Sequence, residues 1–173
     1  YRNRACADAD GAIYIMGHAQ DITAMRAGER ALQRLIEIDP HHIEALQYLA
    51  QERLRQAREA ETEDEALALQ GQARSYLARA YAAGQNDYRT LMLMSELRQG
   101  QPGYPNDNDL LTLGLALDRA PQLAAIRFDY ASALALTGAR EEAVTVLRPL
   151  ANNPHGGGAS GFANEMIAAL EAG

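Results

Sequence analysis

The sequence contains no lysine and no tryptophan, and Cys6 is its single cysteine. Because one cysteine cannot form an internal disulfide, the sequence does not indicate whether its compartment is oxidising or reducing. No apolar run is long enough to span a bilayer and no signal-peptide pattern is present, so we expect no membrane insertion by this segment. The formal net charge of −7 argues against a nucleic-acid-binding surface, which would need clustered basic residues.

All 16 basic side chains are arginines, which we interpret as the coding bias of a GC-rich genome and hence as a sign of a bacterial source. The chain begins with Tyr1 rather than methionine, so we expect it to be part of a longer product. A missing targeting segment is then uninformative, and both the cytoplasm and the periplasm stay open as its location.

Apolar residues recur at helical rather than strand spacing along almost the whole chain. One stripe consists of Ala31, Leu32, Leu35 and Ile36, and the next of Ile43, Leu46, Ala50 and Leu54. No convincing run of alternating β-branched residues is present. The sequence therefore predicts an all-α fold of about eight or nine helices with no sheet.

A short polar junction separates these helical stretches at intervals. It contains Pro40 followed by His41 and His42, and similar junctions lie at Gln85 and Pro121, at intervals of 45 and 36 residues. Intervals in this range indicate a helical repeat, in which each helix pair packs against the next pair.

Small residues occupy the positions where the repeated helices would approach closely, and larger apolar residues flank them. The small residues are Ala50, Ser95 and Ala131 in the first helices and Gly28, Ala73 and Ala143 in the second helices. This alternation, with the tight turn "TGAREEA" at residues 137–143, resembles the tetratricopeptide repeat family, whose unit has about 34 residues. The resemblance covers roughly residues 24–154 and implies a right-handed α-solenoid of antiparallel helix pairs.

The resemblance divides the chain into units at residues 8–40, 41–85, 86–121 and 122–154, with a closing helix at 159–171. Residues 8–22 would form the first helix of the opening unit, with Ile13, Met16 and Gly17 on its packed face. The second unit exceeds the family length through "QAREAETEDEALALQ", so we expect both of its helices to be extended. In the third unit "RQGQPGYPNDND" predicts a loop, after which Asp107 or Asn108 would cap the next helix. Two departures from the family pattern are Arg127, where an apolar residue is usual, and Asp109, where a small one is usual.

Several short motifs imitate sites. His41 and His42 are adjacent, lack further ligands at zinc-like spacing and fall at a junction, so we interpret them as a turn. "HGGG" at 155–158 resembles a lipase oxyanion loop, but it lacks a strand and a nucleophile elbow, which favours a flexible loop before the closing helix.

The acidic run at 59–65 is typical of a solvated helix face. We find no nucleophile–base pair, metal cluster or cofactor fingerprint, and therefore expect no catalytic, metal or cofactor site.

In the tetratricopeptide family the first helix of each pair lines a concave, partner-binding face. Carried over to this chain, the resemblance implies that this face contains Glu44, Gln47, Gln51 and Arg55, then Arg89, Met92 and Glu96, and finally Phe128 and Ser132. Some relatives clamp the carboxylates of chaperone tails with lysine and asparagine, but the corresponding positions here are Gln47, Gln51, Met92 and Phe128. The sequence thus argues against a chaperone clamp.

The function that the resemblance implies is a scaffold module, not an enzyme, that binds a protein or peptide on its concave face. The alternative is an accessory or substrate-recruiting domain of a larger enzyme, such as a transferase or peptidase, with its catalytic part upstream of Tyr1. The full-length reading frame would discriminate between them. The sequence also leaves open whether the chain forms homo-oligomers.

Overall fold

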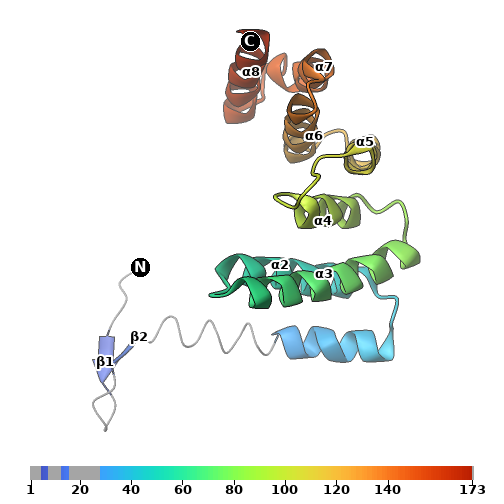
Figure 1. Ribbon diagram of the computed structural model, residues 1–173, viewed down its shortest axis with the longest axis vertical. Helices are drawn as coiled ribbons and strands as arrows, with labels where there is room; N and C mark the ends of the chain where they lie inside the picture. The colour runs from blue at the N-terminus through green and yellow to red at the C-terminus, as the bar shows by residue number, and fades with distance from the viewer. Residues whose placement is uncertain (1–4, 8–12, 16–27, 173) are drawn as a thin grey trace.

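A computed structural model describes residues 5–7, 13–15 and 28–172, and every regular element within residues 28–172 is a helix (Figure 1). The all-α prediction is confirmed for this part of the chain. Its helices are residues 28–38, α2 (Ile43–Glu59), α3 (Glu63–Ala83), α4 (Tyr88–Arg98), α5 (Asp107–Arg119), α6 (Ala124–Leu136), α7 (Arg140–Ala151) and α8 (Gly157–Ala172).

Two short strands, β1 (Ala5–Ala7) and β2 (Ile13–Ile15), pair antiparallel and form a two-stranded sheet. The sequence predicted no sheet and placed Ile13 on a helix over residues 8–22. That prediction is wrong at Ile13–Ile15, where two β-branched residues flank a tyrosine, a composition that favours a strand once a partner is present. Residues 8–12 and 16–27, which include Met16 and Gly17, lie outside the described residues.

The junctions between units share one backbone geometry. In each, the N–H of the fourth residue donates to the carbonyl of the first: His42 to Asp39 (3.2 Å), Asp87 to Gly84 (3.3 Å) and Leu123 to Ala120 (3.1 Å). A fourth junction, which the sequence analysis did not recognise, has the same bond from Gly156 to Asn153 at 3.0 Å, with Pro154 between them. The interpretation of His41 and His42 as a turn is confirmed.

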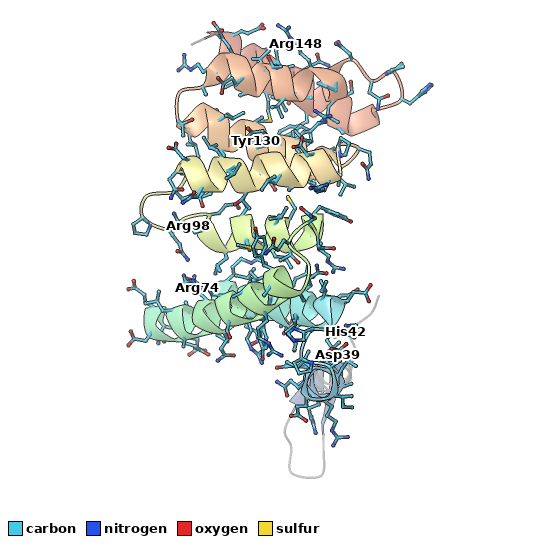
Figure 2. All side chains as sticks on the ribbon, turned by 90° about the vertical axis from the view of Figure 1, so that its right-hand side faces the viewer. Asp39, His42, Arg74, Arg98, Tyr130 and Arg148 are labelled. Carbon is cyan, nitrogen blue, oxygen red and sulfur yellow. The ribbon has the colours of Figure 1, made fainter. Side chains whose placement is uncertain are left out.

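The helices follow one another in chain order along the long axis of the molecule (Figure 1). Each helix from α2 to α7 packs against the next one, and α2 also contacts α4, as α6 contacts α8. In Figure 1, α5 lies to the right of α6, and α7 lies to the right of α8. Figure 2 shows the same succession from the side, from Asp39 and His42 near the bottom to Arg148 near the top.

Small residues lie at the helix contacts, as the repeat pattern predicts. Five of the six predicted positions are buried: Ala50, Ala73, Ser95, Ala131 and Ala143. The sixth, Gly28, is exposed, and a methyl group placed on it would meet no described atom within 4 Å. The helix predicted to pack against it, over residues 8–22, falls mostly outside the described residues, so this contact stays a prediction.

The second unit is long because both of its helices are extended, as predicted: α2 has 17 residues and α3 has 21, whereas α4 has 11. The acidic run at 59–65 spans the turn between α2 and α3 rather than one helix face, and Thr62 caps α3 by accepting from the Glu65 N–H at 3.2 Å. The first turn of α3 contains Glu63, Asp64 and Glu65. Their negative charges interact favourably with the positive N-terminal end of the helix dipole.

The cap of α5 is Asn106, one residue before Asp107 and two before Asn108, which were the predicted caps. The Asn106 side chain accepts from the N–H groups of Asn108 (2.9 Å) and Asp109 (3.2 Å), while the Asp109 carboxylate accepts from the Asn106 N–H at 3.0 Å. This reciprocal capping box satisfies free amide groups at the start of the helix. It also explains why an aspartate stands where the family pattern has a small residue.

Asp109 and Arg127, the two departures from the family pattern, form hydrogen bonds within the stack. Asp109 is buried and accepts from the guanidinium of Arg98, at 3.1 Å from Nε and 3.2 Å from Nη2. Arg127 donates to the carbonyls of Pro121 (3.1 Å) and Val146 (3.0 Å), and so connects α6 to the preceding junction and to α7. Both side chains thus form specific polar bonds at positions where the family pattern has a small or an apolar residue.

Enlarging a small residue at a helix contact should destabilise the fold. Ala73 and Ala143 are fully buried, so we expect Ala73→Leu and Ala143→Leu to lower the free energy of unfolding by roughly 1–3 kcal/mol through overpacking. Ala78 is exposed on the same helix as Ala73, and Ala78→Leu should change it little. Urea unfolding measures the free energy of unfolding of all three variants. A larger loss of this free energy for Ala78→Leu than for Ala73→Leu would contradict the packing.

Candidate functional site

An exposed aromatic ring and an arginine stack on each other between α2 and α4. The guanidinium carbon of Arg89 lies 4.6 Å from the centroid of the Tyr48 ring, and Tyr48 is 49% exposed. Arg89 Nη2 also donates to Gln51 Oε1 at 3.3 Å. A cation above an aromatic face is attracted by the negative electrostatic potential of the ring. The two helices thus hold an arginine in a fixed place at the surface.

Arg55 lies one turn further along α2, but its charge is engaged within the helix. It donates to both carboxylate oxygens of Glu52, at 2.9 and 2.6 Å, and to Glu59 at 2.6 Å. These bonds raise the pKa of Arg55, and its bond to Glu52 holds the pKa of that carboxyl below its usual range. A partner would have to compete with two carboxylates for this guanidinium.

A second connection between α2 and α4 is the ion pair of Arg58 and Glu96, in which Nη1 lies 2.5 Å from Oε1. Beyond it on α6 stands Asp129. Burial raises the pKa of the Asp129 carboxyl, and the neighbouring charge of Glu96 raises it further. No ion pair among the described residues includes Asp129. No described cation therefore compensates its charge through an ion pair.

Gln47 belongs to the interior rather than to the surface. It is 2% exposed, and its Nε2 donates to Asp87 Oδ1 at 2.5 Å and to Thr90 Oγ1 at 2.8 Å. Asp87 Oδ1 also accepts from the Thr90 N–H at 2.9 Å, which caps α4. Gln47 thus joins α2 to the start of α4, and its side chain is out of a partner's reach.

The remaining predicted residues differ in accessibility. Glu44 and Ser132 are exposed. Met92 is half-buried against the core cluster that contains Leu91. Phe128 is half-buried and meets Phe162 of α8 edge-to-face, with ring centroids 5.0 Å apart and an interplanar angle of 69°.

The structure brings together Gln51, Arg89 and Glu96 from the predicted set and adds Tyr48, Arg58 and Asp129. We call this surface of α2, α4 and α6 the candidate face. The sequence carried a signal for two of the added residues, because Tyr48 and Arg58 share one helical face with Gln51. No local signal marked Asp129, whose environment depends on Glu96 of another helix.

The motifs that imitate sites have structural roles. His42 Nδ1 accepts from the Ala45 N–H at 3.3 Å and caps α2. Within the described residues, no group of three or more histidine, cysteine, aspartate or glutamate side chains is placed to hold a metal ion. Gly157 and Gly158 of "HGGG" belong to α8, which begins at Gly157 rather than at residue 159, and Gly156 ends the preceding turn.

No protein-family model matches the chain, and neither the curated proteins nor the solved structures contain a match to it. Among the described helices, none combines the length and the apolar character needed to cross a bilayer.

We expect Gln47→Leu to destabilise the fold. The substitution removes two hydrogen bonds to buried or partly buried groups of α4, which should lower the free energy of unfolding by about 1–3 kcal/mol. Gln51→Leu, at an exposed position one turn further along α2, is the matched control and should have a smaller effect. Chemical unfolding monitored by circular dichroism measures both, and equal stability of Gln47→Leu and the wild type would contradict the structural role of Gln47.

We expect Asp129→Asn to stabilise the protein near pH 7. The pKa of Asp129 is raised by burial and by Glu96, so the folded state binds its proton more tightly than the unfolded state does. Stability therefore falls as the pH rises from the unfolded pKa through the folded pKa. The advantage of Asp129→Asn should be present above the folded pKa and vanish below about pH 3.8, the usual aspartate range. Thermal melts of both proteins between pH 3 and pH 7 measure this stability difference. A lower stability of Asp129→Asn than of the wild type at pH 7 would contradict the raised pKa of Asp129.

Proposed function

We propose that the chain is a helical repeat scaffold that binds a segment of a partner protein on the candidate face. In this proposal α2 to α7 form antiparallel helix pairs of a right-handed solenoid that resembles tetratricopeptide repeats. The recurring junction geometry supports it, as do the contacts of α2 with α4 and of α6 with α8. Such a stack presents one helix from each pair on a continuous surface.

The observation that carries the proposal is the stack of Arg89 on Tyr48. Tyrosine and arginine are enriched among the residues that dominate binding energies at interfaces. The ring and the Gln51 amide already fix the guanidinium, so less conformational entropy is lost when a partner binds. An arginine of this kind suits a carboxylate, to which it can donate two parallel hydrogen bonds. The partner would thus present an acidic group at Arg89 and apolar contact at Tyr48.

Selection of peptides from a random display library on the immobilised chain provides ligands for the test. We expect Arg89→Glu and Tyr48→Ala each to weaken their binding roughly tenfold or more, or about 1.4 kcal/mol. The effect of Arg89→Glu should be larger at low salt, because salt screens exposed charges. Isothermal titration measures the affinities.

Arg148→Glu is the matched charge reversal, because Arg148 is exposed on α7, away from the candidate face (Figure 2). It should leave the affinity unchanged. Peptides that bind Arg89→Glu and Tyr48→Ala as tightly as the wild type would contradict the proposed face. Phe128→Ala tests the predicted binding role of Phe128: a lower melting temperature with unchanged affinity would assign Phe128 to the contact with Phe162 alone.

A further inference from the structure

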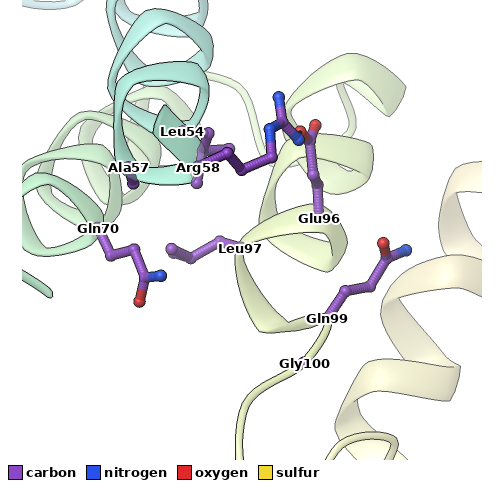
Figure 3. Close-up of a pocket in the computed structure, with 8 residues that line it drawn as sticks. All are labelled: Leu54, Ala57, Arg58, Gln70, Glu96, Leu97, Gln99 and Gly100. Atoms are coloured by element: carbon purple, nitrogen blue, oxygen red, sulfur yellow. Dashed lines mark hydrogen bonds and ion pairs between the residues drawn. The ribbon is translucent and has the colours of Figure 1, made fainter. Parts of the chain in front are cut away.

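The pocket shown in Figure 3 lies where the long helices α2 and α3 extend past the end of α4. Its apolar lining residues, Leu54, Ala57 and Leu97, are buried, and the Arg58–Glu96 ion pair at its edge is already formed. None of its lining residues carries a buried polar side-chain atom without a hydrogen-bond partner. It therefore has no feature that selects one ligand over another.

A second pocket, between α4 and α5, contains such an unpaired group. Its volume is about 280 Å³, just below the range of roughly 300–1,000 Å³ that is typical of ligand sites. All but one of the side chains named below are polar. The residues that line it include Met94, Ser95 and Arg98 of α4 and Asn108, Asp109 and Thr112 of α5.

Ser95 supplies the unpaired group. The residue is 2% exposed, and its hydroxyl oxygen is buried without a hydrogen-bond partner in the described part of the chain. Ala50 and Ala131 occupy the equivalent positions of the neighbouring units, so the helix contact itself does not require a hydroxyl. A buried hydroxyl without a partner lowers stability relative to alanine. A bound group that pairs with it explains the serine better than packing does.

The Arg98–Asp109 pair indicates where the hydroxyls of Ser95 and Thr112 lie. The pair joins α4 to α5 through hydrogen bonds of 3.1 Å from Nε and 3.2 Å from Nη2. Ser95 precedes Arg98 by three residues and Thr112 follows Asp109 by three, and residues three apart share one face of a helix. Both hydroxyls therefore belong to the helix faces that meet at the pocket.

The same pair selects a neutral ligand. Each oxygen of the Asp109 carboxylate accepts a hydrogen bond from the Arg98 guanidinium, so the two charges compensate each other. A carboxylate ligand would be repelled by Asp109, and an ammonium ligand would be repelled by Arg98. Either ligand would also lose hydration without gaining a partner of its own. An uncharged polar group avoids both costs.

The hydrogen-bonding groups that remain in the lining include donors and acceptors. Thr112 Oγ1 donates to the Asn108 carbonyl at 2.8 Å, which leaves the hydroxyl oxygen as an acceptor. The Asn108 side-chain amide forms no hydrogen bond with the other described residues, so it can donate and accept. The Ser95 hydroxyl can also do both. A primary carboxamide complements this set, because it carries N–H donors and a carbonyl acceptor on one planar group.

We propose that the pocket between α4 and α5 binds a neutral primary carboxamide. The hydroxyl oxygens of Ser95 and Thr112 accept from its N–H groups, and the Asn108 amide donates to its carbonyl. Met94 is half-buried next to Ser95, and its flexible, unbranched side chain moves aside to admit the ligand. The carboxamide belongs either to a free small molecule or to a glutamine or asparagine side chain of another protein. This inference does not use the candidate face and is independent of the proposed function.

Propionamide is the probe for the carboxamide group. It should shift the nuclear magnetic resonance signals of the Met94 and Thr112 methyl groups in a saturable manner. N,N-dimethylpropionamide, which lacks the donors, and propionate, which is charged, should each bind at least about tenfold more weakly. Absence of a saturable shift with propionamide would overturn the site. Equal affinity for all three compounds would overturn the choice of a carboxamide.

L-Glutamine and acetyl-glutamine-methylamide distinguish the two sources of the group. The capped residue represents a side chain within a protein, whereas the free amino acid represents a small molecule. Tighter binding of the capped residue would assign the site to a protein side chain. Tighter binding of L-glutamine would assign it to a free molecule.

Ser95→Ala separates binding from packing. It should weaken propionamide binding about tenfold or more, while the melting temperature stays unchanged or rises because the unpaired hydroxyl is lost. Ser75→Ala, at an exposed position of α3, is the matched control and should change neither quantity. Thr112→Val provides an independent test and should also weaken binding. Unchanged affinity of Ser95→Ala and Thr112→Val would overturn the proposed contacts.

Discussion

The stack of helices depends on one hydrogen bond, repeated at each junction between units, from the fourth residue of a turn to the carbonyl of its first. The bond fixes the backbone of four residues, and the next helix begins immediately afterwards. Pro40, Pro121 and Pro154 occupy the second position, where the fixed φ of proline suits the turn. At the junction that starts at Gly84 the second residue is Gln85, so the same turn forms there without a proline. The same geometry thus recurs although the units differ in length.

Polar side chains reinforce this geometry inside the helix contacts. Gln47 joins two helices through Asp87 and Thr90, and Arg127 ties α6 to the carbonyl of Pro121. Buried polar groups are costly when unpaired but are well tolerated when each finds a partner. These residues therefore specify how neighbouring helices are placed. Apolar contacts alone would allow one helix to shift along the next.

Local sequence predicts the helices of residues 28–172 and three of the four junctions because helical periodicity and turn residues act over short distances. It does not predict the strand at Ile13–Ile15, which requires a partner strand, or the cap at Asn106, where neighbouring polar residues compete for one role.

The candidate face was predicted in part for a geometric reason. Gln47, Gln51 and Arg55 follow a spacing of four residues, and each such step turns about 40° beyond a full helical turn. The row therefore drifts off the face, and Gln47 enters the interior. Arg58, seven residues from Gln51, lies about 20° from it around the helix, whereas Tyr48 lies about 60° from Gln51 on the side away from Gln47. Part of the environment of Asp129 is the charge of Glu96 on another helix, so no local sequence pattern predicts it.

The helix over residues 28–38 contributes no buried side chain, and its Ile38 is 83% exposed. The described polar contacts that hold it and the following junction are the Glu29–Arg53 ion pair and a hydrogen bond from Arg79 to the Pro40 carbonyl. Local opening is easiest where few apolar contacts are lost. Amide protons of this helix should therefore exchange with solvent well before those of α4, which is enclosed by neighbours on both sides. We therefore expect the described stack to open first at this helix, while α2, α4 and α6 stay folded.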